Sequence, residues 1–264
     1  MPNAPIRDII TYYEEAGSGP PLVLIMGMGG DLQGWALQVP ELSKHFRVIR
    51  FDNRGAGRTS SPDKPYSIAG MADDLAALMD HLGIARAHIL GFSMGGCIAQ
   101  EFALKYPARV DKLILLATTA HIDGYSTNIV KSMVNVRRSN MSREQTQRLT
   151  ATFMFTAGLV NDSARFEAGI QNGLNNPYAQ QDHAFLRQAQ AVLEFDARER
   201  VKGIKAPTLV VAGADDILIP ARNGQALAAA ITGAKLVELP GGHGGCIEFA
   251  GEYNAAFLEF LGAS

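Results

Sequence analysis

A chain of 264 residues, 47% of them hydrophobic and 19% charged, has the composition of an ordinary globular protein with room for one large α/β domain or two small ones. Its net charge of −2 gives no electrostatic reason to expect nucleic acid or an anionic membrane surface as a partner. No apolar run is long enough to span a bilayer, and the first residues do not resemble a secretory signal. We therefore expect a cytoplasmic enzyme that acts on a small molecule, and the sequence predicts no oligomeric state.

Predicted strands and helices alternate along the first part of the chain. In chain order we predict an edge strand over 6–15, a buried strand over 22–26, a helix over 35–46, a strand over 47–52 and a helix over 68–82. A strand over 88–90, a helix over 97–104 and a strand over 112–117 follow. Strands that alternate with helices indicate an α/β fold with a parallel sheet covered on both faces.

The stretch 121–200 interrupts this alternation. It carries methionines and phenylalanines among polar, helix-favouring residues and contains no strong strand pattern. We predict a helical cap over 121–200, inserted into a core domain built from 1–120 and 201–264. In the second part of the core we expect a strand over 208–212, a helix over 221–231, a strand over 235–239 and a helix over 247–261.

A glycine-flanked serine lies where one predicted strand turns into a helix. Residues 91–95 read G-F-S-M-G, which matches the G-x-S-x-G pattern of a nucleophile elbow. Gly91 and Gly95 lack a Cβ atom, so that the strand and the helix can approach closely. Ser93 would then stand at the carboxyl end of the strand, above a helix N-terminus that favours negative charge. Ser93 is therefore the candidate nucleophile.

A serine hydroxyl needs a base, and the base needs a third group to orient it. Parallel-sheet enzymes carry functional groups in the loops at the carboxyl ends of their strands. The loop after the 208–212 strand contains Asp215 and Asp216, and the loop after the 235–239 strand contains His243. The resulting chain order of Ser, Asp and His is the one that α/β-hydrolases use.

Along nearly its whole length, the chain resembles an α/β-hydrolase-fold serine hydrolase of the esterase, methyl-esterase and enol-lactonase-like branch. The motifs that carry this resemblance are F-D-N-R-G-A-G-R-T-S (51–60), G-F-S-M-G-G (91–96), G-A-D-D-I-L-I-P (213–220) and P-G-G-H (240–243). The resemblance implies a mostly parallel central sheet with helices on both faces and an inserted helical cap. Alignment of the acid loop selects Asp216 over Asp215. Asp123 stays an alternative, because some family members carry their acid after the preceding strand.

The same resemblance points to an oxyanion hole made of two backbone N–H groups. Met94 follows the nucleophile directly and is expected to supply one of them. The second is expected from the loop after the 22–26 strand, where the family often reads H-G-x and this chain reads Met26-Gly27-Met28. Met28 is the expected donor. The methionine in place of the usual histidine leaves Gly29 as the alternative.

These residues predict a serine hydrolase that cleaves a carboxylic ester or a lactone through an acyl-enzyme, without a metal or an organic cofactor. Cofactor-free haloperoxidases (perhydrolases) and carbon–carbon bond hydrolases use the same triad and are alternatives. A non-catalytic, hydrolase-like binding protein is a more remote alternative.

The predicted cap is expected to select the substrate. Its apolar cluster Phe153-Met154-Phe155 is expected to pack above Ser93 and to accept an apolar, medium-sized acyl or ring group. Cys97 and Cys246 are too few for a disulfide framework, and we expect both to be buried thiols.

Overall fold

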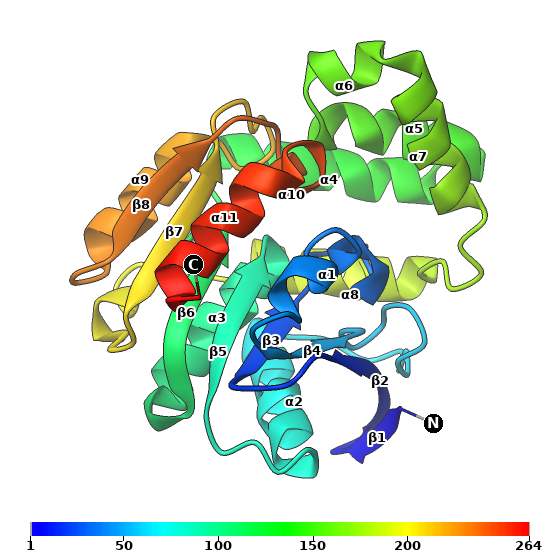
Figure 1. The fold of residues 1–264 in the computed structure, drawn as a ribbon. Helices are drawn as coiled ribbons and strands as arrows, with labels where there is room; N and C mark the ends of the chain where they lie inside the picture. The colour runs from blue at the N-terminus through cyan, green and yellow to red at the C-terminus, as the bar shows by residue number, and fades with distance from the viewer. Residues whose placement is uncertain (1, 264) are drawn as a thin grey trace.

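The computed structural model of the protein describes residues 2–263, and its centre is one eight-stranded sheet (Figure 1). The strand order is β1-β2-β4-β3-β5-β6-β7-β8. The strands are β1 (Asn3–Ile6), β2 (Ile9–Ala16), β3 (Pro21–Ile25), β4 (Arg47–Phe51), β5 (Ala87–Phe92), β6 (Val110–Leu116), β7 (Thr208–Gly213) and β8 (Lys235–Leu239). The pairs β1–β2 and β2–β4 are antiparallel, and all other neighbouring strands are parallel. The predicted α/β architecture is therefore confirmed.

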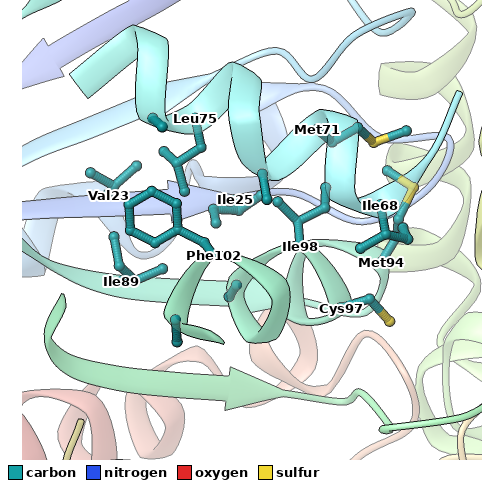
Figure 2. Packing of buried hydrophobic residues seen from close by; sticks show 14 of the residues in the cluster. Val23, Ile25, Ile68, Met71, Leu75, Ile89, Met94, Cys97, Ile98 and Phe102 are labelled. Atoms are coloured by element: carbon teal, nitrogen blue, oxygen red, sulfur yellow. The ribbon is translucent and has the colours of Figure 1, made fainter. Parts of the chain in front are cut away.

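Helices cover both faces of this sheet (Figure 1). In β3, Val23 and Ile25 pack toward α2 (Ile68–His81) and α3 (Met94–Lys105), as Figure 2 shows. The alternate residues of β3 join a second cluster with α1 (Val39–Leu42) and α11 (Ala250–Leu261). Successive side chains of a strand point to opposite faces, so that a strand buried on both faces is apolar throughout. The remaining core helices are η1 (Leu32–Trp35), η2 (Pro107–Arg109), η3 (Val201–Gly203), α9 (Ala221–Ala230) and α10 (Gly245–Glu248).

Five α-helices lie between β6 and β7 in the chain, ahead of η3. They are α4 (Gly124–Arg138), α5 (Arg143–Met154), α6 (Ala157–Asn161), α7 (Ser163–Leu174) and α8 (Asp182–Leu193). The two ends of this segment meet, because the Ala197 N–H donates to the Ala120 carbonyl at 2.8 Å. In Figure 1, α4–α7 form a group beyond one end of the sheet. Helix α8 packs on the core, since its Ala184 and Ala191 belong to the same buried cluster as α2 and α3.

Three predicted elements were wrong in detail. The single strand over 6–15 is a hairpin, β1 and β2, which turns at Arg7 with φ of 47°. The helix over 35–46 is only η1 and the short α1, because Pro40 has no N–H to continue a helix from the residues before it. The helix over 247–261 breaks at Phe249, which separates α10 from α11. None of these differences moves the strands that carry the predicted site.

None of the helices in residues 2–263 is both long enough and apolar enough to cross a membrane.

Candidate active site

Ser93 lies at a strained turn between β5 and α3. Its φ of 54° and ψ of −118° are unusual for a residue with a side chain. The surrounding glycines permit this turn, because a Cβ at Gly95 would lie 2.1 Å from the Ile25 carbonyl oxygen. The Ser93 carbonyl accepts hydrogen bonds from the Gly96 N–H at 2.8 Å and from the Thr118 hydroxyl at 2.8 Å. These contacts hold the strained backbone in place.

The structure brings Ser93, His243 and Asp216 into one chain of hydrogen bonds. His243 Nε2 lies 2.9 Å from Ser93 Oγ, and His243 Nδ1 lies 2.7 Å from Asp216 Oδ2. The imidazole and the carboxylate are buried, whereas Ser93 is only partly so. The other carboxylate oxygen, Asp216 Oδ1, accepts the N–H groups of Leu218 and Ile219, both at 2.8 Å. The carboxylate therefore has fixed partners on both of its oxygens.

The two alternative acids lie elsewhere. Asp215 is exposed, directly before the buried Asp216. Asp123 caps the N-terminus of α4 by accepting the Ser126 N–H at 2.8 Å, and it pairs with Arg222 at 2.9 Å. Of the three aspartates, only Asp216 touches His243 within residues 2–263.

The loop after β3 passes next to the nucleophile. A Cβ added to Gly27 would lie 3.1 Å from Ser93 Cβ, so that the backbone around Gly27 and Met28 borders the serine. In the part of the chain that the structure describes, the N–H groups of Met28 and Met94 have no acceptor. The Gly29 N–H, in contrast, donates to Gln188 Oε1 at 3.2 Å. Two free donors next to a nucleophile form an arrangement that can bind a developing oxyanion.

A cavity of about 20 Å³ opens beside Ser93. Its walls come from the elbow, the segment after β6, the acid loop and the end of α8, namely Ser93, Met94, Cys97, Thr118, Thr119, Ile122, Val192, Phe195 and Ile219. A much larger, more polar cleft of about 710 Å³ lies between the loop at Gly29 and Gly30 and the helices α4, α5 and α7. The small cavity beside Ser93 is apolar on most of its surface and suits a small alkyl group.

The predicted cluster Phe153-Met154-Phe155 does not line the small cavity. Met154 and Phe155 instead pack on the histidine loop, where the Gly244 N–H donates to the Met154 carbonyl at 2.7 Å. The Phe155 ring lies so close to Gly244 that a Cβ there would be 2.5 Å from it. Phe153 packs against a buried cluster that includes Ile122 and Ile219. In this structure Met154 and Phe155 therefore support the loop that carries His243.

Both cysteines are free and buried, as the sequence predicts. Burial raises the pKa of each thiol to about 12. Cys97 lies on the cavity wall near Ser93, with its Sγ 3.6 Å from Thr118 Oγ1. No group of three or more His, Cys, Asp or Glu side chains in residues 2–263 is arranged to hold a metal ion.

Sequence reasoning missed the side chains that hold the loops of the site. Glu248 accepts the Gly242 N–H at 3.0 Å and the Thr156 hydroxyl at 2.6 Å, so that it ties the histidine loop to the segment between α5 and α6. Asn53 donates to the Met26 carbonyl at 2.7 Å. Burial raises the pKa of Asp52, whose Oδ1 accepts the Leu32 N–H at 2.8 Å. Asp52 and Asn53 belong to the 51–60 motif, which marks them in the sequence, but no local pattern marks Glu248 or Gln188.

Comparisons with known proteins agree with this fold. Residues 20–250 match the family model of the alpha/beta hydrolase fold. A protein from Caulobacter sp. strain K31, provisionally named carbamate hydrolase RutD, is 33% identical over 94% of this chain and 95% of its own length. The 3-oxoadipate enol-lactonase 2 of Acinetobacter baylyi is 30% identical over 95% of this chain and 92% of its own. The crystal structure of the enol-lactonase from Burkholderia xenovorans LB400 superposes with a TM-score of 0.90 at 32% identity, covering 98% of this chain and 99% of that one.

Proposed function

Because this chain belongs to the α/β-hydrolase fold family, we propose that it is a serine hydrolase that cleaves carboxylic esters, including lactones, with Ser93, His243 and Asp216 as its triad. The observation that carries this proposal is the continuous hydrogen bonding from Ser93 Oγ through His243 to Asp216, at 2.9 and 2.7 Å. The relatives named as enol-lactonases support the inclusion of lactones.

In the proposed mechanism, His243 Nε2 takes the proton from Ser93 as its Oγ attacks the substrate carbonyl carbon. The carbonyl oxygen becomes an oxyanion, which the N–H groups of Met28 and Met94 stabilise. The tetrahedral intermediate collapses when His243 returns the proton to the leaving alkoxide, which leaves an acyl-enzyme. Water, deprotonated by the same histidine, then releases the acid and restores Ser93. Asp216 orients the imidazole and stabilises its positive charge.

The small cavity suggests a short acyl group. At about 20 Å³ it holds little more than one water-sized group, which corresponds to a methyl or an ethyl substituent on the carbonyl carbon. The acyl group that fits this cavity is therefore shorter than the medium-sized acyl group that the cap composition predicts. The larger cleft of about 710 Å³ borders Gly29 but none of the three triad residues.

The test is hydrolysis of p-nitrophenyl acetate and of a small lactone by the wild-type protein and by Ser93→Ala. We expect the wild type to be active and the variant to lose several orders of magnitude in kcat with an unchanged melting temperature. A fluorophosphonate probe should label the wild type at Ser93, as peptide mass spectrometry would report. Labelling at Cys97 or Cys246 instead would contradict the serine mechanism.

The same assay separates the alternatives. A wild-type protein that is inactive on esters and lactones but cleaves a carbon–carbon bond or forms a peracid from acetate and hydrogen peroxide would replace the ester proposal with one of these reactions. A wild type that turns over none of them and is not labelled by the probe would indicate a binding protein.

A further inference from the structure

Gln188 connects the cap to the loop beside the nucleophile. It lies in the middle of α8, the last α-helix of the inserted segment, and its side chain is completely buried. Its Oε1 accepts the Gly29 N–H at 3.2 Å, and its Nε2 donates to the Arg54 carbonyl at 2.9 Å. Gln188 therefore satisfies one donor and one acceptor from two different core loops.

The partner on the far side of Gln188 is itself rigid. The guanidinium of Arg54 is buried and donates to both carboxylate oxygens of Asp74, each at 2.8 Å. It also donates to both carboxylate oxygens of Asp8, at 2.9 and 3.0 Å. Arg54, anchored by its side chain, presents its carbonyl to one end of the Gln188 amide, and the other end of the same amide accepts the Gly29 N–H.

The loop from Met26 to Leu32 is held at several points, one of which is Asp31 Oδ2, which accepts a hydrogen bond from Asn176 Nδ2 at 2.7 Å. Asn53 holds the Met26 carbonyl at 2.7 Å, Asp52 holds the Leu32 N–H at 2.8 Å, and Gln188 holds the Gly29 N–H between them. The contacts from Gln188 and Asn176 come from the inserted segment, and of these two residues Gln188 is the one that binds a backbone N–H of the loop. Gly29 has φ of 80°, a conformation that glycine adopts readily and other residues rarely adopt.

We infer that Gln188 is a positioning residue of the oxyanion hole: it directs the Gly29 N–H away from the reacting carbonyl and leaves Met28 as the second donor. This inference rests on the proposed function and deepens it, since it assigns the donor that the sequence leaves open between Met28 and Gly29. It also means that the oxyanion hole is complete only when α8 is docked on the core.

The first experiment compares Gln188→Met with Gln190→Met. Methionine keeps the length of the side chain and removes both hydrogen bonds, whereas Gln190 lies exposed two residues further along the same helix and serves as the matched control. For Gln188→Met we expect kcat on p-nitrophenyl acetate to fall by about 10- to 100-fold. This decrease does not exceed the decrease in kcat that follows removal of a whole oxyanion-hole donor, because the variant displaces the donor without deleting it. We expect KM to change by less than about threefold, because the oxyanion contact strengthens only in the transition state.

A tetrahedral mimic provides a readout that a merely structural role would not change. A trifluoromethyl ketone adds to Ser93 and presents an oxyanion, so that its Ki should rise in Gln188→Met by the same factor as kcat falls. Equal losses in substrate affinity and in Ki, or a fully active Gln188→Met with an unchanged melting temperature, would overturn the inference. An inactive wild type would contradict the proposed function itself, which the wild-type assay reports separately.

A second measurement uses the wild-type protein and does not depend on the folding of a variant. In ¹⁵N-labelled protein, binding of the trifluoromethyl ketone should move the amide protons of Met28 and Met94 strongly downfield, and the Gly29 amide should stay near its free position. A large shift of Gly29 with a stationary Met28 would show that Gln188 does not assign the donor, and would overturn the inference.

Discussion

At the scale of single residues, the proposed site combines a strained serine with a carboxylate that has hydrogen-bond partners on both of its oxygens. Ser93 keeps φ of 54° because hydrogen bonds to its carbonyl and close glycine contacts leave it no alternative. Asp216 uses one oxygen for His243 and the other for two backbone N–H groups. The neighbouring Asp215 has none of these contacts with the histidine and faces solvent.

This difference between two adjacent aspartates gives the first prediction. Asp216→Asn should lower kcat by about 10⁴-fold, because the amide does not orient the imidazole in the required tautomer or stabilise its charge. Asp215→Asn is the matched control and should stay within about threefold of the wild type. Steady-state kinetics on p-nitrophenyl acetate would measure both. A larger loss for Asp215→Asn than for Asp216→Asn would mean that the acid is misassigned by one position.

The buried thiols give a second prediction. Because burial raises the pKa of Cys97 to about 12, the fraction present as thiolate at pH 8 is about 10⁻⁴. The native protein should therefore react with iodoacetamide at neither Cys97 nor Cys246 over an hour at pH 8, and the unfolded protein should react at both. Mass spectrometry of the digested protein measures the extent of alkylation at each cysteine. Rapid modification of native Cys97 would contradict the buried, protonated state.

At the scale of elements, Arg54 joins three separate parts of the fold. From the loop after β4, it binds Asp8 in the β1–β2 turn and Asp74 on α2. Lys64 also pairs with Asp8. The hydrogen bond from Arg54, together with Lys64, holds the pKa of Asp8 well below its ordinary value.

The sign of this shift predicts a pH dependence of stability. A carboxylate with a lowered pKa in the folded state stabilises the fold above its unfolded pKa of about 3.9, and this stabilisation is lost as the pH falls toward the folded value. Asp8→Asn should therefore reduce the free energy of unfolding at pH 7. The difference from the wild type should shrink below about pH 4.

Urea unfolding at several pH values would measure this difference. Glu199→Gln, which changes a carboxylate that is 92% exposed, is the control and should show almost no effect at any pH. A difference between wild type and Asp8→Asn that stays constant or grows as the pH falls to 3 would contradict the prediction.

At the scale of the whole molecule, the small cavity belongs to no single part of the chain. The elbow supplies Ser93 and Met94, the acid loop supplies Ile219, and the inserted segment supplies Val192 and Phe195. Under the proposed function this wall sets the acyl length that fits, and a change in one of its segments should change that length.

Acyl chain length is therefore the last prediction. Burial of one methylene is worth about 0.8 kcal/mol, so kcat/KM should rise about fourfold from p-nitrophenyl acetate to propionate and then fall once the cavity is full. Val192→Ala removes two methyl groups from the wall and should move the optimum to a longer chain by one or two carbons. A series from acetate to octanoate measures the optimum, with melting curves for each variant.

Phe153→Ala is the informative comparison for this series. Phe153 lies outside the cavity wall, so the optimum should stay at the wild-type length in this variant. A shift in Phe153→Ala with none in Val192→Ala would instead favour the apolar cluster that the cap composition predicts as the pocket.

The amino-acid sequence by itself determined the features that depend on neighbours in the chain. Short, wholly apolar runs predict the parallel strands, and the glycines around Ser93 predict the turn, because a sharp strand–helix junction tolerates no Cβ there. The order of Ser93, Asp216 and His243 follows from loops at the ends of predicted strands, and the structure brings these three side chains together.

Only the tertiary structure decided which distant groups complete the site. Gln188 and Gly29 are 159 positions apart, and nothing in the residues around either one indicates the contact between them. The cavity wall also brings together residues that lie far apart in the chain. The same is true of the histidine loop, which Phe155 and Glu248 support. Such contacts depend on how the inserted helices dock on the sheet, and docking is governed by the packing of whole surfaces rather than by a local pattern.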